Sequence, residues 1–107
     1  MNVTTNNDLQ CTIALAALEN VIDPEIGLNV VDLGLIYRID FDAPGPGISV
    51  LMTLTTPFCP MGDAITSAVE QVLQETFAAA RITVKLSFDQ PWSHDRISDN
   101  GKKFLNS

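Results

Sequence analysis

The chain has 107 residues, of which 46% are hydrophobic and 18% are charged, as is typical of one globular domain with one core. Thirteen acidic and six basic side chains give a formal net charge of −7, which repels nucleic acid and anionic lipid surfaces. No stretch is apolar over the ~18 residues that a membrane span needs, and no basic region with a following hydrophobic run marks a secretion signal. We therefore expect a cytoplasmic protein that binds neither nucleic acid nor membrane.

The N-terminal part predicts one long helix. Residues 1–8 are polar and are expected to form a flexible N-terminus ahead of a single domain over residues 9–107. Asn7 with Gln10 three positions later is typical of a helix start. The helix must end before Pro24, because a residue that precedes proline avoids the helical conformation. Its apolar residues lie on two adjoining stripes, one with Leu9, Ile13, Ala17 and Val21, the other with Cys11, Leu15, Leu18 and Ile22.

The rest of the chain predicts strands on either side of a second helix. Alternation of apolar and polar residues indicates strands over residues 37–42, 48–55 and 82–88, and the first two should form an antiparallel hairpin. A helical pattern runs from Pro60 to about Ala80, and a short helix can follow Ser98. Each strand has one apolar face, which predicts an α+β two-layer sandwich with a three-stranded mixed sheet and helices on one face. Gly34 marks a bulge or a close backbone approach before the first of these strands.

The stretch TTPFCPMG at residues 55–62 holds Cys59 between two prolines, where the second strand meets the second helix. Proline favours the first helical position, so Pro60 makes Cys59 the expected N-cap residue. Free backbone N–H groups and the helix dipole favour a thiolate there, whereas Asp63 adds opposing negative charge. The alternative is a structural cysteine that packs under the loop. The other cysteine, Cys11, is expected in the core because it shares a stripe with leucines.

Other candidate residues are acidic or aromatic. Asp23 and Glu25 flank Pro24, where acidic residues usually form turns, and Asp32 needs a hydrogen-bonding partner if it is buried. His94 is a candidate metal ligand or base, although a lone exposed histidine is more often neither. Trp92 either covers the end of the core or faces a partner.

Three stretches taken together resemble the SufT and PaaD family of small iron-sulfur assembly domains: DPEIGLNVVDLGLIY, MTLTTPFCPMG and PWSHDRIS. The resemblance covers about residues 9–105. It implies a helix-strand-strand-helix-strand domain, a role in the maturation of iron-sulfur proteins, and Cys59 as the key residue. It also implies a set of assisting or loop-shaping residues, namely Asp23, Glu25, Asp32, Thr55 and Pro60.

A fixed, partly exposed thiolate suits iron or an iron-sulfur cluster in transit. One chain offers a single suitable cysteine, so we expect transient binding that is shared in a homodimer or with a client protein. The predicted function is an assembly, transfer or targeting factor, not an enzyme, whose partners are the iron-sulfur assembly machinery and client apo-proteins. Two alternatives are an adaptor subunit of a multi-component oxygenase or assembly complex with a structural cysteine, and a small thiol enzyme with Cys59 as nucleophile and His94 as base.

Overall fold

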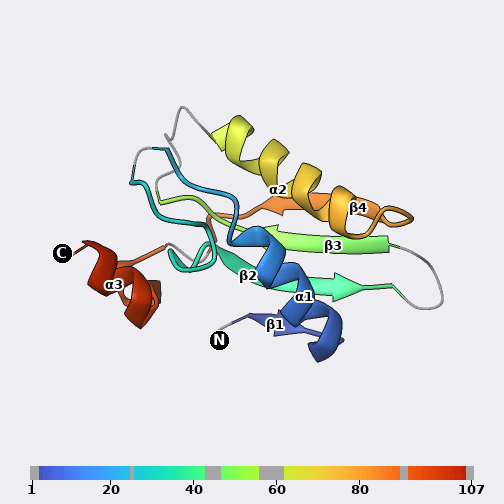
Figure 1. Cartoon of the computed structure of the whole chain (residues 1–107), viewed down its shortest axis with the longest axis horizontal. Coiled ribbons are helices and arrows are strands. Elements are labelled where there is room, and N and C mark those ends of the chain that lie inside the picture. Colours follow the sequence, from blue (N-terminus) through green and yellow to red (C-terminus); the bar gives the residue numbers. More distant parts are fainter. Residues whose placement is uncertain (1–2, 25, 43–46, 56–61, 90–91, 106–107) are drawn as a thin grey trace.

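The computed structural model describes residues 3–24, 26–42, 47–55, 62–89 and 92–105. These residues form a mixed α+β fold around one sheet (Figure 1). The strands are β1 (Thr4–Thr5), β2 (Ile36–Phe41), β3 (Gly47–Met52) and β4 (Arg81–Leu86), and the helices are α1 (Asp8–Leu18), α2 (Gly62–Thr76), the 3-10 turn η1 (His94–Arg96) and α3 (Asp99–Leu105). No described helix is long and apolar enough to cross a membrane.

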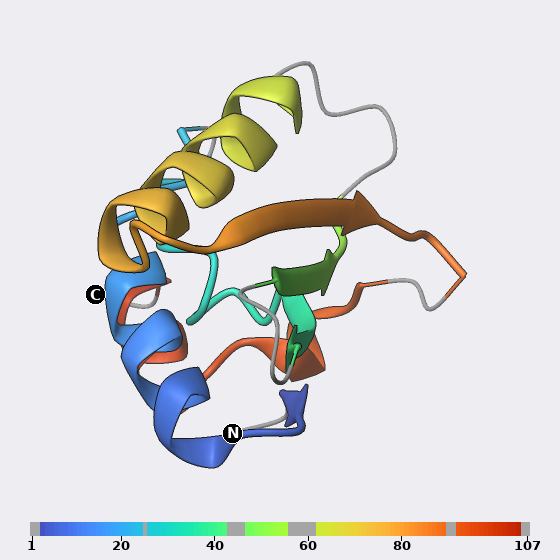
Figure 2. The same ribbon diagram turned by 90° about the vertical axis from the view of Figure 1, so that its right-hand side faces the viewer.

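The sheet has the strand order β1-β2-β3-β4. β2 and β3 form the expected antiparallel hairpin, whereas β3 and β4 run parallel and are connected through α2. Both α1 and α2 lie on the same side of the sheet (Figure 2). The predicted two-layer α+β sandwich with a mixed sheet is therefore confirmed.

The sheet contains a fourth strand that the sequence analysis did not predict. β1 pairs in parallel with β2, with Thr4 opposite Arg38 and Thr5 opposite Ile39. A strand of two residues is too short to show an alternating pattern, so periodicity cannot detect it. Its position depends on pairing with β2, and the prediction of three strands is corrected to four.

The start of α1 agrees with the sequence, but its buried face is only partly as expected. Asn7 is the N-cap, and its side chain accepts a hydrogen bond from the backbone N–H of Gln10 at 3.1 Å. The core side of the helix carries Cys11, Ala14, Leu15 and Leu18, while Leu9 and Ile13 are 74% and 45% exposed. Both stripes are apolar, so periodicity alone cannot decide which one faces the sheet.

Two helices end earlier than the sequence suggests. α1 stops at Leu18, where Glu19 and Asn20 form a turn; after it, Ile22 forms a β-bridge with Asn29, and Val30 N–H donates to Val21 O at 3.0 Å. α2 stops at Thr76, and a turn leads into β4. The side chain of Gln74 holds this turn by donating to the carbonyl oxygens of Ala78 and Ala80.

The core lies between the sheet and the helices. β2 and β3 contribute Ile39, Val50 and Met52, and α2 contributes Ile65, Val69 and Leu73, all of them fully buried. At the far end of the hairpin, the rings of Phe41 and Phe77 meet edge to face with centroids 6.0 Å apart. This packing holds α2 against β2 and β3.

Candidate functional site

The predicted site residues come from segments that meet at one end of the sheet, on the left in Figure 1. β3 and β4 end there, β2 and α2 begin there, and the loop from Glu19 to Leu35 lies at the same end. Thr53 N–H donates to Leu35 O at 2.9 Å, so the end of β3 is bound to the end of this loop. The topology thus gathers the loop and the strand-to-helix connection that sequence analysis singled out.

The connection between β3 and α2 has well-anchored ends. Leu54 and Gly62 are both buried, and a Cβ atom added to Gly62 would lie 2.8 Å from Leu54 Cδ1. The two residues are therefore in contact, which brings the start and the end of the connection together. Thr55 is half-buried at the last described position before it. Cys59 and Pro60, and hence the predicted N-cap, lie outside the described residues.

Asp23 is 1% exposed in the turn that follows α1. Its backbone N–H donates to Leu28 O at 3.0 Å, and its carbonyl oxygen accepts from Gly27 N–H at 2.7 Å. Gly27 has φ +83°, a left-handed conformation that glycine adopts without strain. Both bonds are formed by the backbone of Asp23, so they fix the chain in this turn, and the loop-shaping role of the Asp23 side chain stays a prediction. Glu25, within the same turn, lies outside the described residues.

Asp32 has the partners that a partly buried carboxylate requires. Its Oδ2 accepts from Asn29 Nδ2 at 2.7 Å, and its Oδ1 accepts from Ser98 Oγ at 2.7 Å. Ser98 Oγ in turn accepts from Gly101 N–H at 3.0 Å. The carboxylate therefore connects its own loop to the first turn of α3.

Residues 92–98, which we call the C-terminal segment, bind three successive backbone carbonyls of the loop before β2. Ser98 N–H donates to Asp32 O at 2.8 Å, Trp92 Nε1 to Leu33 O at 2.6 Å, and Arg96 Nε to Gly34 O at 2.8 Å. Trp92 is half-buried and packs against the core, so the structure favours the first of its two proposed roles, that of covering the end of the core. The C-terminal segment therefore holds the loop before β2 in place. The last residue of this loop, Leu35, is the one that is hydrogen-bonded to the end of β3.

Sequence reasoning missed all three of these contacts with the loop, those of Trp92, Arg96 and Ser98. The indirect signal was Gly34, which was expected to mark a close backbone approach. Gly34 has φ +75°, and a Cβ atom there would lie 2.3 Å from Arg96 O. The guanidinium carbon of Arg96 also lies 4.1 Å from the centre of the Tyr37 ring, an arrangement in which the cation is attracted to the aromatic face.

The described residues do not include a complete metal site. No group of three or more His, Cys, Asp or Glu side chains comes together within the part of the chain that the structure describes. His94 belongs to η1, and its side chain lies outside that part. Cys11 is a free cysteine, 4% exposed, in the core as expected.

The burial of Cys11 predicts a large difference in reactivity between the two thiols. Burial raises the pKa of Cys11, the negative charge of Asp8 raises it further, and a hydrogen bond with Thr5 partly offsets both. Because the thiolate is the reactive form, we expect iodoacetamide at neutral pH to modify Cys11 at least ~10-fold more slowly than Cys59. The rate at Cys11 should rise as the pH exceeds 9. Mass spectrometry of digests taken at successive times measures both rates, and equal rates in the folded protein would contradict the expectation.

The fold and these contacts define a small α+β domain in which a loop, a strand end and a helix start meet at one end of the sheet. The chain matches the family model for iron-sulfur cluster assembly proteins over residues 13–86. Fe-S protein maturation auxiliary factor SufT from Staphylococcus aureus is 40% identical over 77% of this chain and 92% of the relative. Fe-S protein maturation auxiliary factor YitW from Bacillus subtilis is 35% identical over 82% of this chain and 85% of the relative. The chain belongs to the iron-sulfur cluster assembly protein family.

A solved structure supports the same assignment. A domain of unknown function from Bacillus anthracis superimposes with a TM-score of 0.84 at 36% sequence identity, over 89% of this chain and 90% of that chain. The sequence-based recognition of a SufT-type domain is therefore confirmed. The names of the two relatives describe them as auxiliary factors of Fe-S protein maturation.

Proposed function

We propose that this protein is an iron-sulfur assembly or transfer factor that binds iron or a cluster transiently through Cys59 and passes it to client proteins. The observation that carries the proposal is membership of the iron-sulfur cluster assembly family, whose relatives include auxiliary factors of Fe-S protein maturation. Thiolates are the ligands that iron-sulfur clusters prefer. Since Cys11 is buried, Cys59 is the thiol of this chain that is left for the cargo.

Incomplete ligation suits a carrier. A cluster normally takes four protein ligands, and one chain supplies one cysteine for it. The other ligands come from the second chain of a homodimer or from the client itself. A cluster held by few bonds can leave by ligand exchange, so the shortage of ligands on this chain favours transfer over storage.

The described residues on either side of the β3-to-α2 connection support the proposal that Cys59 binds the cargo. Contact between Leu54 and Gly62 anchors both ends of the connection, and α2, a helix of 15 residues, directs its N-terminal dipole toward it. Asp63 in the first turn of α2 opposes this effect with its own charge. In this proposal the assisting or loop-shaping residues are Asp23, Glu25, Asp32, Thr55 and Pro60.

The proposed partners are the iron-sulfur assembly machinery and client apo-proteins, and the proposed location is the cytoplasm. The names of the two relatives tie them to the maturation of Fe-S proteins. A factor of this kind must meet both a source of clusters and an acceptor, so it needs at least one surface that recognises other proteins.

A complementation experiment in cells tests the proposal. Cells that lack this protein and any redundant factor receive the wild type, Cys59→Ala or Cys11→Ala at equal abundance, checked by immunoblot. We expect Cys59→Ala to leave the activities of iron-sulfur enzymes at the level of the deletion strain, because the ligand for the cargo is gone. Cys11→Ala is the matched control and should restore them. Full restoration by Cys59→Ala would instead indicate an adaptor with a structural cysteine.

A further inference from the structure

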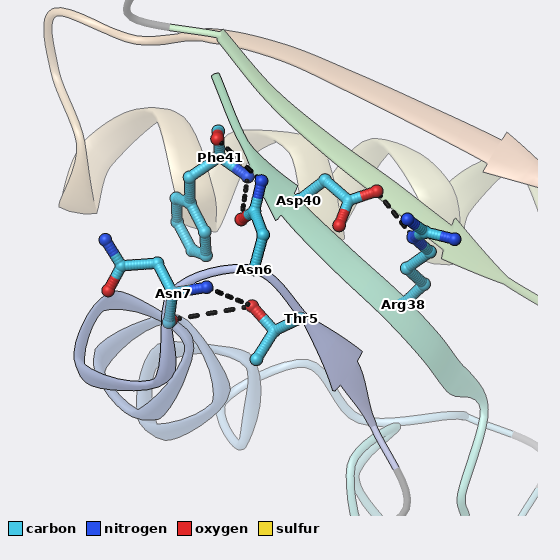
Figure 3. Close-up of polar contacts among 6 residues, drawn as sticks. All are labelled: Thr5, Asn6, Asn7, Arg38, Asp40 and Phe41. Atoms are coloured by element: carbon cyan, nitrogen blue, oxygen red, sulfur yellow. Dashed lines mark hydrogen bonds and ion pairs between the residues drawn. The ribbon is translucent and has the colours of Figure 1, made fainter. Parts of the chain in front are cut away.

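The two edges of the sheet differ in whether their backbone groups are covered. The β2 edge carries β1, and next to it the side-chain amide of Asn6 donates to Phe41 O at 2.9 Å and accepts from Phe41 N–H at 2.8 Å (Figure 3). This amide occupies the backbone groups that an added strand would use. β4 forms the opposite edge, and no strand of the described chain pairs with its outer side. An uncovered edge of this kind can accept an extended segment of another protein.

The register identifies which backbone groups of β4 face outward. Ser87 N–H donates to Met52 O at 2.9 Å, so Ser87 and the odd-numbered residues before it direct their backbone groups toward β3. Successive residues of a strand direct these groups to opposite sides. The N–H and C=O groups of Ile82, Val84 and Leu86 therefore point to the free edge.

The side chains of β4 are also incompletely covered. Ile82, Val84 and Leu86 lie on the helix side and are only half-buried, although their partners in β3, Ile48, Val50 and Met52, are buried. A strand added beside β4 would continue this apolar layer and remove more of its surface from water. The added strand needs apolar residues at alternate positions to do so.

The charges on the other face of β4 determine which kind of added strand would bind. Arg81, Thr83 and Lys85 are exposed on the side of the sheet away from the helices. Arg38 on β2 forms an ion pair with Asp40 (Figure 3). Among the described residues, Arg81 and Lys85 have no ion-pair partner. A second copy that paired through its own β4 would bring four cations together on one face, which is unfavourable. Acidic residues on that face of the added strand would be attracted.

We infer that β4 is a docking edge for an extended segment of a partner protein in which apolar and acidic residues alternate. The backbone of the segment pairs with Ile82, Val84 and Leu86, its apolar side chains extend the core layer, and its acidic side chains meet Arg81 and Lys85. This inference goes beyond the proposed function, because it needs no metal and no thiol. A failure here would leave Cys59 chemistry untouched, and the reverse is also true.

The test uses the full chain without iron and a short synthetic peptide, blocked at both ends, in which glutamate and valine alternate. We expect the peptide to bind and to slow the hydrogen exchange of the amides of Ile82, Val84 and Leu86. Methylation of the peptide nitrogens on one edge should abolish binding, and methylation on the other edge should not, because an added strand uses one edge only. The same peptide with lysine in place of glutamate should bind at least ~10-fold more weakly.

Two matched double variants measure how much Arg81 and Lys85 contribute to the binding of the peptide. Arg81→Ser with Lys85→Ser should weaken the binding about 10-fold, whereas Lys102→Ser with Lys103→Ser, which removes the same charge from α3, should leave it unchanged. The inference is overturned if the glutamate peptide does not bind, if the lysine peptide binds equally well, or if both methylation patterns have the same effect. Dimers of the chain that form through β4 and block the peptide would also overturn it, since the edge would then belong to a second copy.

Discussion

Cys59→Ser is expected to abolish the binding of iron and sulfide when the protein is reconstituted anaerobically. The serine hydroxyl is a hard, neutral ligand at pH 7, whereas the thiolate is soft and charged. The wild type should show the visible absorption of an iron-sulfur centre, with about one cluster for every two chains if a homodimer shares it. The variant should show the absorption of unbound reagents alone. Absorption spectra together with iron and sulfide analysis of the desalted protein measure the result.

Cys11→Ala is the control for this experiment. Cys11 lies on the buried side of α1 and is 4% exposed. Its replacement therefore removes one sulfur from the chain without changing the proposed site. This variant should bind iron as the wild type does, at a cost of about 1 kcal/mol in stability. A Cys59→Ser protein that retains the full absorption would show that Cys59 is not the ligand. A Cys11→Ala protein that loses it while folded would show that binding does not depend on Cys59 alone.

Gly34→Ala is expected to destabilise the fold by about 3 kcal/mol or more. The positive φ of +75° alone costs an alanine about 1–2 kcal/mol, and the new Cβ would lie 2.3 Å from the backbone oxygen of Arg96. The C-terminal segment must then move away from the loop, which loses the hydrogen bonds to residues 32–34. Such a loss is a large part of the 5–15 kcal/mol that a domain of this size has.

Gly27→Ala separates the energetic cost of a positive φ from the cost of the steric contact with Arg96. Gly27 has a similar φ of +83°, but among the described residues a Cβ there would meet only Phe104 Cζ, at 4.0 Å. Its replacement should cost about 1–2 kcal/mol. Urea unfolding followed by circular dichroism measures both losses. Equal losses for the two variants would mean that Arg96 moves aside easily and that the C-terminal segment does little to hold the loop.

Much of the fold could be predicted from local pattern. Strict alternation identified β2, β3 and β4, and the pair Asn7 and Gln10 identified the start of α1. These features depend on neighbours in the chain. The buried face of α1 could not be chosen, because Leu9 and Ile13 are as apolar as the residues that enter the core, and β1 is too short to have a period.

The candidate site, too, could be predicted only in part from the sequence. Strand ends and helix starts place Asp23, Thr55 and the β3-to-α2 connection at one end of the sheet, as the element order implies. The contacts of Trp92, Arg96 and Ser98 with the loop could not be predicted. Each of the three residues donates to a backbone carbonyl oxygen, which every residue has, so the loop sequence carries no mark of these bonds. They also join residues that are 59, 62 and 66 positions apart.

These long separations have a consequence for biosynthesis. The loop of residues 32–34 is synthesised before residues 92–98, so it lacks these hydrogen-bond partners until the later segment has been made. The hairpin of β2 and β3 depends on neighbouring segments, whereas the loop beside it depends on residues that are 59 or more positions further along the chain. A growing chain should therefore be unable to receive its cargo in a defined geometry until residues 92–98 have been made.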